Sequence, residues 1–85
     1  MQAAEQRVDW FEVINCVVRK GYSLGSVAAH VNVPKSTLIG WKQGAEPRYS
    51  EGERLLAFWM QVTGNERGAL PMVGVDAWWS YHSKV

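Results

Sequence analysis

A short corner in the chain, Asn32-Val33-Pro34, limits the fold more than any other feature of the sequence. It separates two stretches whose apolar residues recur at helical spacing, and proline disfavours helix at the residue before it. Asparagine tolerates the left-handed conformation that a tight turn between two helices requires. We therefore expect one helix to end at this corner and another to leave it at roughly 90–120°.

Capping residues and glycines predict four helices in all. The first covers about residues 9–20 and ends at Gly21, and the second is capped by Ser23. The third begins at Pro34, whose fixed φ suits the first helical position, and ends at Gly44. The fourth opens at Ser50 and Glu53, which have capping-box spacing, and ends near Gly64.

Each predicted helix has one apolar face, and these faces would share a core. The expected inward residues are Val8, Phe11, Ile14 and Val18, with Trp10, Val13 and Val17 beside them, then Leu24, Val27, Ala28 and Val31, then Leu38 and Trp41, and finally Leu55, Leu56, Phe58, Trp59 and Val62. Ala28 lies where the second and third helices must cross closely, and Val33 would fill the turn from inside.

The remaining residues, 65–85, differ in composition from the helical part. The stretch GNERGALPMVGV is rich in Gly and Pro and predicts a loop. DAWWSYHSKV predicts either a short helix capped by Asp76 or an extended aromatic tail. With 85 residues, of which 47% are hydrophobic, the chain can bury one modest core. We expect an all-α, compact four- to five-helix bundle, with residues 1–64 as the main domain and 65–85 as an aromatic C-terminal segment.

Charge is distributed unevenly, although the formal net charge is only +1. Residues 19–48 carry five basic side chains against one acidic side chain, while both flanking regions are net acidic. A polyanion would therefore be attracted to the middle third of the chain. No run of 18 apolar residues is present, so a membrane-spanning helix is not expected. The single cysteine, Cys16, is interpreted as a small hydrophobic residue and is typical of a reducing cytoplasm.

The stretch SLGSVAAHVNVPKSTLIGW resembles the helix-turn-helix of the lambda-repressor-like DNA-binding family, which includes the phage Cro and repressor proteins. Ala28 matches the small-residue position of that family, and Asn32 matches its turn glycine. The resemblance covers roughly residues 21–62 and extends into WKQGAEPRYSEGERLLAFW, a form common in short phage and prophage regulators. Two positions depart from the pattern: Pro34 replaces a Ser or Asp cap, and Gly40 replaces a long polar side chain.

The resemblance implies that the third helix reads DNA and that neighbouring residues hold the phosphate backbone. The implied DNA-binding residues are Lys35, Ser36, Thr37, Ile39, Lys42 and Gln43 on that helix, Arg48, Tyr49 and Ser50 before the fourth helix, and Tyr22 and Ser23 before the second. Each has a plainer interpretation as a solvated surface residue. In the plainer interpretation of Arg48, its side chain forms a surface ion pair with Glu46 or Glu51.

The aromatic residues divide into two groups. Trp41 is interpreted as a core residue rather than a base-stacking one, because it continues the face of Leu38. Trp10 and Trp59 are assigned to the core as well. Trp78, Trp79 and Tyr81 exceed what a four-helix core needs, so they either form a homodimer interface or fold back onto the core of their own chain.

No residues suggest catalysis or a cofactor. His30 and His82 are far apart and have no partner at metal-ligand spacing. Gly21 and Gly25 do not form a phosphate-binding loop. We therefore expect a protein without enzyme activity, metal or cofactor.

The resemblance implies a transcription regulator, a repressor or Cro-like protein, that binds an inverted-repeat operator in double-stranded DNA as a homodimer in the bacterial cytoplasm. Two alternatives remain open. One is a DNA-binding adaptor subunit of a phage packaging or recombination complex, with a protein partner at the C-terminal segment. The other is a protein-binding module with the same scaffold that inhibits a host factor.

Overall fold

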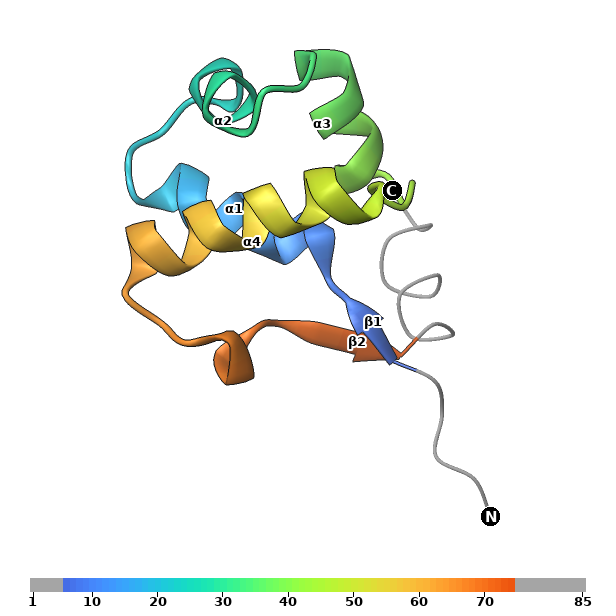
Figure 1. Ribbon diagram of the computed structural model, residues 1–85, viewed down its shortest axis with the longest axis vertical. Coiled ribbons are helices and arrows are strands. Elements are labelled where there is room, and N and C mark those ends of the chain that lie inside the picture. Colours follow the sequence, from blue (N-terminus) through green and yellow to red (C-terminus); the bar gives the residue numbers. More distant parts are fainter. Residues whose placement is uncertain (1–5, 75–85) are drawn as a thin grey trace.

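The structure is a computed structural model that describes residues 6–74, and in this range it is mostly helical (Figure 1). The elements in chain order are β1 (Gln6–Val8), α1 (Trp10–Arg19), α2 (Leu24–Val31), α3 (Lys35–Lys42), α4 (Tyr49–Thr63), the 3-10 helix η1 (Arg67–Ala69) and β2 (Met72–Gly74). Helices α1 and α4 pack together in the middle, α2 and α3 lie at one end, and the two strands lie at the other (Figure 1).

The core lies among the four helices, as the apolar spacing predicts. Its buried residues are Trp10, Val13, Ile14, Val17, Val27, Ala28, Val31, Val33, Leu38, Trp41, Leu55, Leu56, Phe58 and Trp59. The buried face of α1 is rotated slightly from the expected one, because Phe11 and Val18 are only half-buried. The three tryptophans assigned to the core are all there, and the rings of Trp10 and Trp41 lie 6.4 Å apart.

The predicted start of the fourth helix is wrong in detail. Helix α4 begins at Tyr49 with Arg48 in the N-cap position, and no side chain caps it. Instead of reaching back to Ser50, the Glu53 carboxylate accepts two hydrogen bonds from the Arg67 guanidinium, at 3.0 and 2.6 Å. A bidentate pair with a guanidinium is stronger than the single hydrogen bond that a backbone N–H could donate to the same carboxylate. Pro34 likewise lies one residue before its predicted place, as the N-cap of α3.

The expectation of a mostly helical chain is confirmed, but the loop expected after residue 64 also contains a 3-10 helix and a strand. Strands β1 and β2 form a two-stranded antiparallel sheet, in which Gln6 pairs with Gly74 and Val8 with Met72. The ladder is extended by a hydrogen bond from the Asp9 N–H to the Pro71 carbonyl at 2.9 Å. Residues 70–74 are thereby held against the beginning of the chain, and Leu70 packs on the core.

No helix within residues 6–74 is both long enough and apolar enough to cross a membrane.

Candidate nucleic-acid interface

The turn between α2 and α3 has the left-handed residue that the sequence predicts. Asn32 has φ 64° and ψ 48°, and among the described residues it is the only one besides glycine with positive φ. The Asn32 N–H donates to the Ala29 carbonyl at 3.2 Å, and the Val33 N–H donates to the Ala28 carbonyl at 3.0 Å. These two bonds form a Schellman motif, which ends α2 abruptly and sets the direction of α3.

A side chain from α4 also holds the end of α2. The Arg54 Nε–H donates a hydrogen bond of 2.8 Å to the Val31 carbonyl, one of the carbonyls that a helix end leaves without a helical partner. The positive guanidinium also complements the negative end of the helix dipole. The sequence gives no sign of this contact, since the two residues are 23 positions apart. Arg54 therefore fixes the position of the turn, and so of α3, relative to α4.

Helix α3 buries one face and exposes part of the other. Leu38 and Trp41 are buried, and α3 packs on both α1 and α2. Of the residues predicted to contact DNA on this helix and directly after it, Lys35, Ser36 and Gln43 are exposed, while Thr37, Ile39 and Lys42 are half-buried. The Lys42 ammonium lies 5.5 Å from the centre of the Phe11 ring, so this cation is partly directed toward α1.

The N-terminus of α3 lacks both of the usual stabilising groups. Its N-cap, Pro34, makes no side-chain hydrogen bond, and no acidic residue lies in its first turn. The Pro34 carbonyl accepts from the N–H groups of Thr37 and Leu38, at 3.0 and 3.2 Å. The positive end of this helix dipole is therefore not neutralised by a carboxylate in the first turn, and an external anion would be favoured there.

The residues at the start of α4 are well exposed. Arg48 and Ser50 are exposed, and 83% of the Tyr49 surface is accessible. Glu46, one of the two ion-pair partners considered for Arg48, pairs with Arg7 at 3.2 Å. Within residues 6–74 no ion pair involves Arg48. Glu51, in the first turn of α4, is an opposing charge at this helix end.

Tyr22 and Ser23, the predicted contacts before α2, both have partners inside the protein. The Ser23 hydroxyl accepts a 3.1 Å hydrogen bond from the Ser26 N–H, as the predicted cap requires. The Tyr22 ring is half-buried and lies edge-on to Phe58, with 5.2 Å between ring centres. The structure thus gives these two residues a packing or capping role. The other exposed candidates lie on or directly after α3 and at the start of α4.

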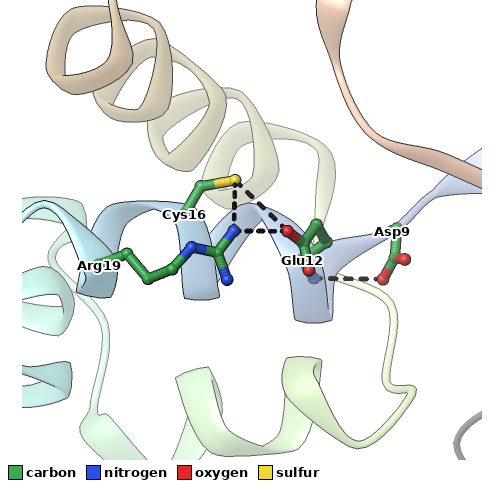
Figure 2. Close-up of polar contacts among 4 residues, drawn as sticks. All are labelled: Asp9, Glu12, Cys16 and Arg19. Atoms are coloured by element: carbon green, nitrogen blue, oxygen red, sulfur yellow. Dashed lines mark hydrogen bonds and ion pairs between the residues drawn. The ribbon is translucent and has the colours of Figure 1, made fainter.

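Cys16 lies at the edge of the core rather than inside it. It is half-buried between Glu12 and Arg19, with its Sγ 3.7 Å from Glu12 Oε2 and 3.5 Å from an Arg19 nitrogen (Figure 2). Glu12 and Arg19 are themselves joined by a 2.6 Å ion pair, and this hydrogen bond raises the pKa of the Arg19 guanidinium. Figure 2 also shows Asp9, which accepts from the Glu12 N–H at 3.2 Å and caps α1.

The described part of the chain holds no group of three or more His, Cys, Asp and Glu side chains that could bind a metal ion. Trp78, Trp79 and Tyr81, the predicted dimer interface, lie outside the described residues. Comparisons of this chain with protein-family models, curated proteins and solved structures found no match.

Proposed function

We propose that the protein is a sequence-specific DNA-binding regulator, which places α3 in the major groove of an operator as the second helix of a helix-turn-helix. The observation that carries this proposal is the corner between α2 and α3, where a left-handed Asn32 and a Schellman motif present a short helix with an exposed polar edge. The resemblance of residues 21–62 to the lambda-repressor-like family supports the same function.

The charges in the first turns of the four helices support the choice of α2 and α3 as the DNA-binding surface. Helices α1 and α4 have an acidic residue in the first turn, Glu12 and Glu51, whereas α2 and α3 have none. The two helices of the corner therefore keep the positive ends of their dipoles, which favour phosphate groups. Phosphate contacts fix the position of a protein on a duplex, while contacts to base edges give specificity.

Each exposed candidate residue is assigned either to the base edges or to the phosphate backbone. In this docking mode the N-terminal residues of the recognition helix meet the base edges, so Ser36 and Thr37 would read sequence and Lys35 would contact either a base or a phosphate. Arg48 and Tyr49 would hold the phosphate backbone beside α3. In a homodimer, the two copies of α3 would contact half-sites about 34 Å apart, and the operator would be an inverted repeat.

The decisive experiment is the selection of bound duplexes from a random pool, followed by binding titrations with the selected duplex and a scrambled one at several salt concentrations. We expect one enriched inverted repeat. If Lys35 and Arg48 of both protomers contact phosphates, the plot of log K against log salt should have a slope of about −4.

Single substitutions separate the two roles. Arg48→Ala should weaken binding to both duplexes and reduce the magnitude of the salt slope by about 1 per protomer. Ser36→Ala should mainly lower the preference for the selected duplex. Arg19→Ala is the matched control, because it also removes a positive charge but lies in the last turn of α1, where it lines a cavity with Cys16, Thr63 and Asn65.

The alternatives give different results in the same assay. Equal affinity for the selected and scrambled duplexes would contradict a regulator and favour the adaptor subunit. No binding to any duplex at low salt would contradict both DNA-binding functions and favour the module that inhibits a host factor. Light scattering on the free protein would test the proposed homodimer independently.

A further inference from the structure

A surface cavity away from α3 has the character of a small-ligand site. Its volume is about 490 Å³, and it is lined by Lys20, Tyr22, His30, Phe58, Gln61 and Val62. These residues come from the end of α1, the link to α2, α2 itself and α4. The volume falls within the range of roughly 300–1,000 Å³ that is usual for ligand pockets. No residue of α3 lines the cavity, so it is separate from the proposed DNA surface.

Three aromatic side chains form one part of this cavity. The rings of His30 and Phe58 are stacked, with their centres 4.5 Å apart and their planes at 17°. The Tyr22 ring stands edge-on to both, 5.8 Å from His30 and 5.2 Å from Phe58. Phe58 is buried and its position is therefore fixed, while His30 is exposed. The His30 ring is thus stacked on a buried ring, while His30 itself remains exposed.

The polar residues of the cavity favour an anion. Lys20 supplies a positive charge, Tyr22 and Gln61 supply hydrogen-bond donors, and no Asp or Glu among residues 6–74 lines the cavity. Within residues 6–74 no ion pair involves Lys20. A second cavity of about 390 Å³, lined in part by Arg19, Thr63 and Asn65, also contains Lys20. Lys20 therefore lines both cavities.

We propose that this cavity binds a small aromatic acid, whose ring stacks on His30 and whose acidic group pairs with Lys20. The aromatic ring of the ligand would stack on His30, which is itself stacked on Phe58. Its acidic group would pair with Lys20, which has no carboxylate partner in the described structure. The proposal goes beyond DNA binding and does not depend on it, because no residue of α3 lines the cavity.

The proposal is tested on the full chain, labelled with 15N, by titration with indole-3-acetate and separately with indole, which has the same ring without the acidic group. We expect saturable shifts of the backbone amides of Lys20 and His30 and of the Gln61 side-chain amide. For so small a ligand a dissociation constant on the order of 1 mM is expected for indole-3-acetate, and indole should bind about fivefold more weakly.

Two variants test which residue binds the acidic group of the ligand and which binds its ring. Lys20→Gln should reduce the affinity for indole-3-acetate about fivefold and leave that for indole unchanged, because only the ion pair is lost. His30→Ala should weaken both probes by a similar factor. Lys35→Gln is the control for charge and should change neither. The spectrum of each variant also shows whether it is folded.

Three outcomes would overturn the proposal. The first is the absence of saturable shifts, which would mean that the three rings only pack α2 against α4. The second is a set of shifts centred on other residues, and the third is equal affinity of wild type and Lys20→Gln for indole-3-acetate. None of these outcomes would affect the proposed DNA-binding function, which is measured without the ligand.

Discussion

Helices α1 and α3 bury their apolar faces in the same core, but their N-termini are built in opposite ways. The start of α1 is completed by the protein itself, since the Asp9 side chain caps it and Glu12 adds a negative charge to its first turn. The start of α3 has Pro34 as its N-cap, with no side-chain hydrogen bond and no acidic residue in the first turn. Both helices are well packed, so the difference does not come from loose structure at α3.

The comparison shows how a stable helix can keep its positive end available. Capping normally stabilises a helix by about 1 kcal/mol, and α3 does without this contribution. Its position depends instead on two buried side chains, Leu38 and Trp41, and on the Schellman motif at Asn32. Packing thus carries the stability of α3, which leaves its N-terminus free for an external anion.

The largest expected effect comes from removing the packing that holds α3. Trp41 is 3% exposed, and its replacement by alanine should lower the free energy of unfolding by about 3–5 kcal/mol. Urea unfolding followed by circular dichroism measures this. Gln43→Ala, at the exposed end of the same helix, should change it by less than about 0.5 kcal/mol. A loss below about 1 kcal/mol for Trp41→Ala would contradict the view that packing holds α3 in place.

A second substitution gives α3 the cap that α1 has. Pro34→Asp would place a carboxylate at the α3 N-terminus, where Pro34 already has the extended conformation of an N-cap. The new cap contributes about 1 kcal/mol and the loss of proline rigidity costs about 0.4–1 kcal/mol, so the stability should change little. DNA affinity, measured by fluorescence anisotropy, should fall about tenfold because the carboxylate repels phosphate.

Pro34→Asn is the matched control, because it caps without a charge and should largely retain DNA affinity. Asp9→Ala makes the reverse change at α1: it should lower stability by about 1 kcal/mol and leave DNA affinity unchanged. If Pro34→Asp and Pro34→Asn bound DNA equally well, the start of α3 would not be an anion site.

A smaller effect is expected from Gly40, in the middle of α3. An added Cβ would meet only the Ala45 Cβ at 3.9 Å, which is an ordinary contact. Gly40→Ala should therefore raise the free energy of unfolding by about 0.5–1 kcal/mol, through the higher helix propensity of alanine. Gly44→Ala provides the contrast, since the φ of 114° at that position is strained for any other residue and the variant should be destabilised. Thermal unfolding of the two variants should show shifts of opposite sign.

The smallest effect concerns Glu53, at the exposed pair with Arg67. The hydrogen bonds from Arg67 lower the pKa of Glu53 below its ordinary value of 4.5. A lowered pKa in the folded state means that the pair stabilises the protein above the ordinary pKa and that this contribution is lost as pH falls through the folded-state pKa. Glu53→Gln should therefore lower the melting temperature slightly at pH 7, and this difference from the wild type should shrink as the pH falls below 4.5. The difference should shrink in high salt, because the pair is exposed.

The sequence predicts the corner well and the contacts between distant segments poorly. Asn32 could be placed because few residues accept a positive φ, and Leu38 and Trp41 because a helical period marks the buried face. The strands were not predictable, since three residues such as those of β2 give too little alternation to indicate a strand. The partner of β2 also lies more than 60 positions away, as the pairing of Gln6 with Gly74 shows.

The candidate site shows the same division between local and distant information. The capping box at Ser50 follows a local rule, but a more distant partner, Arg67, takes Glu53 instead. The bond from Arg54 to the Val31 carbonyl likewise depends on how α4 crosses the end of α2, which only the packed structure determines. The exposure of Lys35 and Ser36 was easier to predict, because it depends only on the position of each residue on its own helix.

The pairing of β1 with β2 has a consequence for how the protein folds. Because Gln6 is paired with Gly74, this small ladder encloses all four helices in a single loop of chain. Closing so long a loop costs entropy that only a few backbone hydrogen bonds oppose, so the ladder should form after the helices have packed. In hydrogen-exchange experiments the amides of the ladder should open first, before global unfolding.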